Sequence, residues 1–170
     1  IPAPVAAQLL FPTTALPRFS HGSTRSRAEF WESETAMKVA GRPMRTIWLA
    51  EDGRTVEIID QTRLPHELVI LRLASVADAA RAIRDMQVRG APLIGAAAAY
   101  GVALAMADDA SDKSLDRAVD TLAATRPTAV NLRWALDDMR HHLSELPAGQ
   151  RFAAALARAG AVAEEDVAIN

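Results

Sequence analysis

Apolar residues recur at helical spacing from Ser75 onward, and this periodicity limits the possible folds more than any other feature of the chain. The first helix face predicted in this way carries Val76, Ala79, Ala80, Ile83 and Met86. The same spacing predicts four further helices, over 92–106, from Ser111, over 130–143 and from Arg151. The chain from Ser75 onward is therefore expected to form a helical bundle.

Residues that favour helix ends mark where several of these helices begin. Ser75 followed by Asp78 resembles a capping box, with Asp in place of the usual Glu. Thr128 is placed to cap the helix over 130–143, and the Pro147-Ala148-Gly149 stretch is expected to break the chain before the last helix. The residues expected in the core are Leu115, Ala118, Val119 and Leu122 of the third helix, Leu132, Leu136, Met139 and Leu143 of the fourth, and Trp48 and Trp134.

Short β-rich runs precede the helices. Residues 46–49 and 56–59 flank Asp52-Gly53, a dipeptide that favours a hairpin turn. A third run over 68–71 predicts another strand in the same small sheet. A small antiparallel sheet followed by a helical bundle is an α+β fold and not a βαβ repeat.

Composition and charge argue against several classes of protein. Of the 170 residues, 50% are apolar and 24% are charged, and the formal net charge is -2, an ordinary balance for one globular domain with or without a tail. The chain is not basic enough to indicate nucleic-acid binding, and no uninterrupted apolar run predicts a membrane-spanning helix. Cysteine is absent, which excludes disulfides and thiolate sites within these residues. The histidines lack metal-ligand spacing, so no metal is expected; they are His21, His66, His141 and His142.

Residues 1–36 differ in composition from the rest of the chain. Four of the nine prolines lie there, and residues 1–28 contain no acidic residue. Such a segment cannot bury a core and is expected to be disordered. Two interpretations stay open, an organellar transit peptide and, the one we favour, translated sequence upstream of a true start at Met37. Because the chain stops inside a predicted helix, residues 37–170 are expected to be a domain truncated in or after its last helix.

The stretch Val88-Arg89-Gly90-Ala91-Pro92 is the first candidate for chemistry. Gly90 permits a tight turn, and Pro92 favours the first turn of a helix, which continues in small residues over 95–101. A helix N-terminus has free N–H groups and a partial positive charge, and Arg89 beside it can add a bidentate contact to phosphate. These residues indicate an anion site; the alternative is a helix–helix corner with an exposed arginine.

Other polar stretches are weaker candidates. Pro127 disfavours helical geometry at Arg126, so this arginine is expected in an extended connector, where it is either a second anion contact or an ordinary surface residue. For Asp60-Gln61-Thr62-Arg63-Leu64-Pro65, local turn chemistry is a better explanation than a site. The acidic run over 164–166 is expected to be a solvated helix face.

Three of these stretches occur in one chain in a fixed order. They are Asp60-Gln61-Thr62 with Leu64-Pro65, Val88-Arg89-Gly90-Ala91-Pro92 with Ile94-Gly95, and Arg126-Pro127-Thr128-Ala129-Val130-Asn131-Leu132. Together they resemble methylthioribose-1-phosphate isomerase, and the resemblance covers about Met37 to Asn170, including Glu164-Glu165-Asp166-Val167. Each motif is weak by itself, whereas the ordered combination is specific.

The resemblance implies a reaction and a domain organisation. The family converts 5-methylthioribose 1-phosphate to 5-methylthioribulose 1-phosphate in methionine salvage, as a cytoplasmic homodimer without a metal or nucleotide cofactor. Its N-terminal domain of a small sheet and helices is followed by a Rossmann-like domain, which is missing here. The substrate contacts that carry over are Arg89, Gly90, Ala91 and Arg126. The family's catalytic Cys and Asp are expected beyond Asn170, so no catalytic residue is assigned, and the chain alone is expected to be inactive.

Two related classes stay open beside this one. Ribose-1,5-bisphosphate isomerases act on another phosphosugar, and regulatory subunits of the guanine-nucleotide exchange factor of translation initiation share the architecture without catalysis. The nearly intact motifs at Arg89 and Arg126 favour the enzyme. Because half of the expected pocket is missing, and because the helix over 92–106 is expected to expose an interface, the chain is predicted to be poorly soluble or to self-associate.

Overall fold

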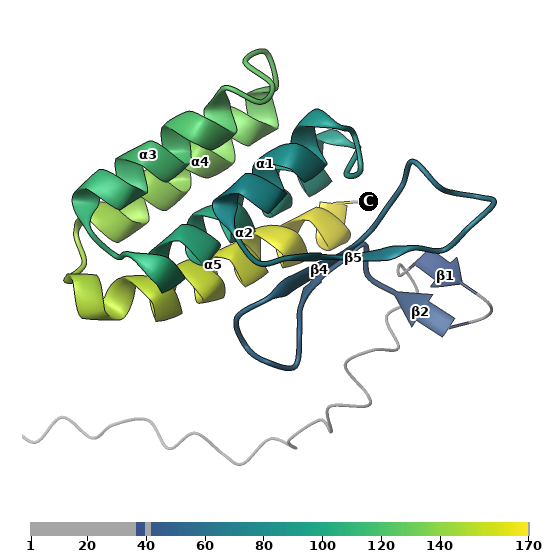
Figure 1. Cartoon of the computed structure of the whole chain (residues 1–170), viewed down its shortest axis with the longest axis horizontal. Helices are drawn as coiled ribbons and strands as arrows, with labels where there is room; N and C mark the ends of the chain where they lie inside the picture. The colour runs from purple at the N-terminus through teal and green to yellow at the C-terminus, as the bar shows by residue number, and fades with distance from the viewer. Residues whose placement is uncertain (1–36, 40–41, 170) are drawn as a thin grey trace, which may run out of the picture. The chain divides into compact units, whose positions relative to one another are not determined.

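The computed structural model describes residues 37–39 and 42–169, so the expectation of disorder over 1–36 lies outside the described residues. Two antiparallel sheets are followed by five helices (Figure 1). The strands are β1 (Met37–Val39), β2 (Arg42–Met44), β3 (Ile47–Leu49), β4 (Val56–Ile59) and β5 (Ile70–Leu73). The helices are α1 (Val76–Arg84), α2 (Ala91–Asp108), α3 (Asp112–Ala123), α4 (Val130–Ser144) and α5 (Ala148–Ile169). The predicted α+β class is confirmed.

The larger sheet has the order β3-β4-β5 with both pairs antiparallel, so the predicted hairpin and its third strand are confirmed. The third strand, however, begins at Ile70 and not at residue 68. Asp60 N donates to Val69 O at 2.9 Å, and the ladder proper begins only where Ile70 pairs with Ile59. Leu68 is 43% exposed and lies before the strand. The apolar run that predicted this strand therefore begins two residues earlier than the paired residues do.

The β1–β2 hairpin was not predicted. Its second strand contains Pro43, which pairs with Lys38. Proline inside a run of residues argues against a strand, because it cannot donate to the ladder, and it is found mainly on edge strands. A two-stranded sheet has only edge strands, and so it accommodates this proline.

Helix α2 is the centre of the bundle and packs against α1, α3, α4 and α5. Every residue from Leu93 to Met106 is buried. The expectation that this helix exposes an interface is therefore wrong, since the chain's own helices cover it.

Helix α2 is also long and apolar enough to cross a membrane by length and composition alone, contrary to the sequence expectation. In the structure, 78% of it is buried.

The small residues of α2 explain how four helices fit around it. A Cβ added at Gly101 would stand 3.0 Å from Cβ of Ala79 on α1 and 3.1 Å from Cδ1 of Leu122 on α3. These neighbours occupy the space of a methyl group. The predicted close approach of other elements to this helix is confirmed.

The helix starts are partly as predicted. Ser75 Oγ accepts from Asp78 N at 3.2 Å, and Ser111 caps α3 in the same way, so both predicted starts are confirmed. Thr128 does not cap α4: Ala129 is the N-cap residue, because Ala129 N donates to Arg126 O and closes a turn that contains Thr128. The predicted break between the last two helices is present at residues 145–147, but α5 begins at Ala148 and not at Arg151, and Gln150 N donates to Pro147 O at 2.9 Å.

The predicted apolar faces of α3 and α4 are buried. Met86, predicted on the apolar face of α1, and Trp134, predicted in the core, are both exposed. Helix α1 ends at Arg84, and Met86 follows with a φ of 60° and a side chain that is 46% exposed. Trp134 is 50% exposed and does not belong to the buried face of α4, which carries Leu132, Ala135, Leu136, Met139 and Leu143. Trp48 is only half-buried, and its indole N–H donates to the carboxylate of Glu57 at 2.8 Å.

Candidate anion-binding site

The first turn of α2 has the geometry predicted for residues 88–92. Gly90 is the N-cap residue with a φ of 93°, and Pro92 lies in the first turn. A Cβ at Gly90 would meet nothing within 4 Å, so glycine is required by the backbone conformation and not by lack of space. Arg89, Gly90 and Ala91 are all exposed, and no side chain caps this helix end. Its first N–H groups are therefore directed outward as free donors.

The turn after β4 is fixed against this helix start. Asp60 is 5% exposed, and its Oδ1 accepts from the amide of Thr62 at 2.9 Å and from the hydroxyl of Thr62 at 2.6 Å. The turn thus has the local chemistry predicted for it. Next to Asp60, Gln61 Oε1 accepts from Arg89 N at 2.8 Å, and Gln61 O accepts from Arg89 Nη2 at 3.2 Å. Two of the three motif stretches are therefore in direct contact.

The third stretch reaches the same region through the packing of α4 on α2. The carbonyl oxygen of Asn131 lies 3.2 Å from the position that a Cβ at Gly95 would take. The first turn of α4 therefore contacts the second turn of α2. Arg126 precedes α4 and is half-buried, and its guanidinium has no hydrogen bond or ion pair with any described residue. Arg133 Nη2 donates to Pro127 O at 2.6 Å and holds the connector in place.

The electrostatics of this region favour an anion. Helices α1 and α3 have serine caps at Ser75 and Ser111, whereas α2 and α4 have no side-chain cap. The N-terminal ends of α2 and α4 each carry a partial positive charge, and Arg89 and Arg126 add two full charges beside them. Within residues 37–39 and 42–169, no group of three or more His, Cys, Asp or Glu could hold a metal ion. The arrangement is suited to a phosphate group.

Sequence reasoning assigned no role to Gln61 beyond a turn. Its contact with Arg89 joins residues that are 28 positions apart, and such a contact leaves no local pattern. The only signal was the position of Gln61 inside the first of the three ordered motifs.

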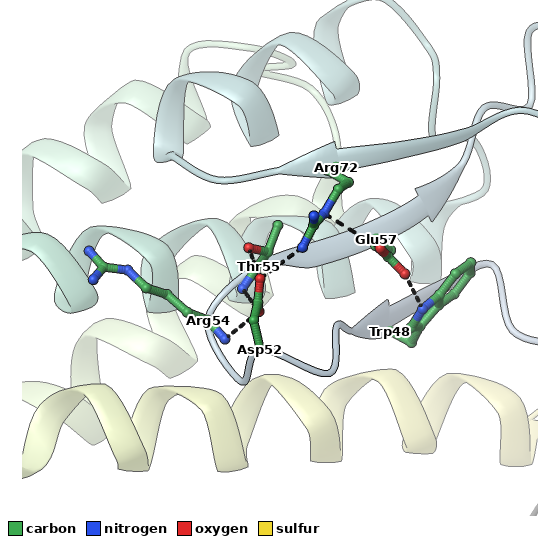
Figure 2. A network of polar contacts seen from close by, with 6 residues as sticks. All are labelled: Trp48, Asp52, Arg54, Thr55, Glu57 and Arg72. Atoms are coloured by element: carbon green, nitrogen blue, oxygen red, sulfur yellow. Dashed lines mark hydrogen bonds and ion pairs between the residues drawn. The ribbon is translucent and has the colours of Figure 1, made fainter.

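The most extended polar network of the sheet is a separate feature. Figure 2 shows its six residues, which are Trp48, Asp52, Arg54, Thr55, Glu57 and Arg72. Arg54 Nη2 reaches Asp108 Oδ1, at the last residue of α2, at 2.6 Å. Because α2 has 18 residues, this network lies roughly 27 Å along the helix from the candidate site at its first residue. Its ion pairs therefore brace the hairpin and do not belong to the anion site.

Comparisons with known proteins agree with the motifs. Residues 87–169 match the model of the initiation factor 2 subunit family. A methylthioribose-1-phosphate isomerase from Paramagnetospirillum magneticum is 65% identical over 134 residues, which are 79% of this chain and 37% of that protein. The match to the family model covers slightly less than half of the chain. The resemblance of the chain to methylthioribose-1-phosphate isomerases is confirmed, and the chain spans little more than a third of the length of that relative.

Two solved structures share the fold. Subunit delta of translation initiation factor eIF-2B from A. fulgidus has a TM-score of 0.66 and 37% identity, covering 73% of this chain and 38% of that chain. The 5-methylthioribose 1-phosphate isomerase from Pyrococcus horikoshii has a TM-score of 0.65 and 35% identity, covering 71% and 36%. The fold is thus common to an isomerase and to a translation factor subunit. The family includes isomerases, and the fold alone does not separate the two classes.

Proposed function

We propose that the chain is part of an aldose–ketose isomerase that converts 5-methylthioribose 1-phosphate to 5-methylthioribulose 1-phosphate. Arg89, Gly90, Ala91 and Arg126 bind the phosphosugar, and Arg89 and Arg126 contact its phosphate. The observation that carries the proposal is the convergence of the three motif stretches, through the Gln61–Arg89 hydrogen bonds and the Gly95–Asn131 packing. The identity of 65% to a protein named for this reaction supports it.

The chemistry of the substrate explains what the whole enzyme must supply. The phosphate on C1 closes the sugar as a glycoside-like ring, so the ring opens before hydrogen moves from C2 to C1. A general acid at the ring oxygen serves the first step, and an apolar pocket that excludes water favours a direct hydride shift in the second. No described residue is assigned to either step. The catalytic Cys that the resemblance implies is not among these 170 residues, which contain no cysteine.

The proposal includes the setting of the enzyme. It acts in methionine salvage in the cytoplasm, as a homodimer, and without a metal or nucleotide cofactor. Its partner molecule is a small phosphosugar, and neither nucleic acid nor a membrane takes part.

Two alternatives are related to this proposal, and one of them is supported by a solved structure. A ribose-1,5-bisphosphate isomerase would use the same first phosphate contact, with further basic residues for the second phosphate. A non-catalytic regulatory subunit is supported by the TM-score of 0.66 to the translation factor subunit. The higher identity to the isomerase, 65% against 37%, favours the enzyme.

The test is an isomerase assay on the full-length gene product with each phosphosugar in turn. The reaction is run in deuterated water and monitored by proton NMR. The expected result is conversion of methylthioribose 1-phosphate with no deuterium at C1 of the ketose product. Deuterium at C1 would exclude a direct hydride shift but would leave the isomerase assignment in place. Turnover of ribose 1,5-bisphosphate alone, or of neither sugar, would transfer the assignment to the corresponding alternative.

A further inference from the structure

We infer that Gln61 is a positioning residue of the anion site, which holds Arg89 in the orientation in which the arginine meets a phosphate. The inference rests on the proposed function and deepens it, because it names a residue that acts on the substrate only through another. It follows from three hydrogen bonds that Gln61 makes with the loop before α2.

These three bonds fix both the backbone and the side chain of the loop. Gln61 Oε1 accepts from Arg89 N at 2.8 Å, and Gln61 O accepts from Arg89 Nη2 at 3.2 Å. Gln61 N donates to Gln87 O at 3.0 Å. One residue therefore holds the main chain on both sides of Val88 and one nitrogen of the guanidinium.

Gln61 can act in this way because the turn that carries it is itself fixed. The buried carboxylate of Asp60 accepts from the amide and the hydroxyl of Thr62, and Asp60 N donates to Val69 O at 2.9 Å. The position of Gln61 is thus set by the sheet, and Gln61 transmits that position to the start of α2.

The contacts with Gln61 affect binding in two ways: they lower the entropy that Arg89 loses on binding, and they leave guanidinium N–H groups free for the phosphate. An exposed arginine samples many rotamers, and ordering it on binding lowers affinity. The bond from Nη2 to Gln61 O orders the side chain in advance, while the remaining guanidinium N–H groups stay available for a bidentate phosphate contact. The bond to Arg89 N orients the backbone just before the N-cap residue Gly90.

The experiment compares two glutamine variants of the full-length gene product. Gln61→Met keeps the length of the side chain and removes the acceptor for Arg89 N. Gln87→Met is the matched control, because Gln87 contributes only its main-chain carbonyl to this contact. A third variant, Gln61→Glu, restores an acceptor. The readouts are the affinity for methylthioribose 1-phosphate by calorimetry and the hydrogen exchange of the Arg89 amide by NMR.

The positioning role predicts about tenfold weaker binding in Gln61→Met and unchanged binding in Gln87→Met. The Arg89 amide is expected to exchange faster in Gln61→Met, while amides in the middle of α2 keep their protection, and to regain protection in Gln61→Glu. A general loss of folding would instead speed exchange throughout α2. Parent-like affinity in Gln61→Met would overturn the positioning role alone. If the full-length parent neither binds nor isomerises methylthioribose 1-phosphate, the proposed function is overturned, and the positioning role with it.

Discussion

Arg158 on α5 donates two hydrogen bonds to the carboxylate of Asp138 on α4, from Nε to Oδ2 at 2.7 Å and from Nη2 to Oδ1 at 3.2 Å. Nη1 of the same guanidinium reaches Glu165 at 3.0 Å. The hydrogen bonds to Asp138, followed by that to Glu165, raise the pKa of Arg158 above its ordinary value. Both side chains of the first pair are largely covered, at 23% and 28% exposure, so this pair is the strongest polar link between α4 and α5.

The Arg158–Asp138 pair is expected to contribute measurably to stability. Asp138→Asn should lower the free energy of unfolding by about 1–2 kcal/mol, because a bidentate pair between two covered groups is lost. The control is Glu165→Gln, because the Glu165 carboxylate is 53% exposed and its loss should change the free energy of unfolding by less than about 0.5 kcal/mol. Urea unfolding monitored by circular dichroism measures both. Equal effects of the two substitutions would show that burial does not set the strength of these pairs.

Asp52 should make stability depend on acid pH. Hydrogen bonds from the Thr55 hydroxyl, the Thr55 amide and the Arg54 amide hold the pKa of Asp52 at about 2, below its ordinary 3.8. A lowered pKa in the folded state adds stability above the unfolded value, and this stability is lost as the pH falls from about 4 to about 2. Urea midpoints over this range should therefore fall more steeply for the parent than for Asp52→Asn. Parallel curves would contradict the assignment.

Two glycines in helices should respond to alanine in opposite directions. A Cβ at Gly101 would stand 3.0 Å from Cβ of Ala79, so Gly101→Ala forces α1 and α2 apart and should cost about 1 kcal/mol or more. At Gly160 the nearest atom is the hydroxyl of Tyr100 at 3.9 Å, an ordinary contact. Gly160→Ala should therefore stabilise the chain by about 0.5–1 kcal/mol through helix propensity. Thermal unfolding of the pair measures the difference, and a gain in stability at Gly101 would refute the packing argument.

Gly90 should be intolerant of a side chain for a different reason. Its φ of 93° is a conformation that residues with a Cβ rarely adopt, although there is open space around it. Gly90→Ala should cost about 1–3 kcal/mol in strain or move the start of α2. Gly149→Ala is the control, since Gly149 also has open space but lies in the first turn of α5. The free energies of unfolding of Gly90→Ala and Gly149→Ala are compared by urea denaturation. Similar values for the two variants would contradict backbone strain at position 90.

Local signals in the sequence predicted much of this fold. The period of apolar residues in α3 and α4 placed their buried faces, and Ser75 and Ser111 marked two helix starts, because these are interactions within a few residues. Features that depend on distant neighbours were missed. The exposure of Trp134 depends on where α2 and α3 pack against α4, and the burial of α2 depends on four other helices.

The candidate site shows the same division. Gly90 and Pro92 predicted the turn and helix start at which Arg89 lies, since both act on their own backbone. Nothing local indicated that Gln61 would contact Arg89, or that Asn131 would pack on Gly95 and so bring the first turn of α4 to the second turn of α2. These relationships arise from the packing of the sheet and α4 on α2. Their only trace in the sequence was the fixed order of the three motifs.

The most direct test of the central claim is the affinity of the full-length gene product for methylthioribose 1-phosphate, measured by isothermal titration calorimetry. The parent is expected to bind, and Arg89→Ala and Arg126→Ala should each lose about 2 kcal/mol of binding free energy, roughly thirtyfold in affinity. Arg63→Ala is the control, because Arg63 is an exposed arginine in the neighbouring turn. Binding that is unchanged in both Arg89→Ala and Arg126→Ala, or equally weakened in Arg63→Ala, would contradict a phosphate site at the starts of α2 and α4.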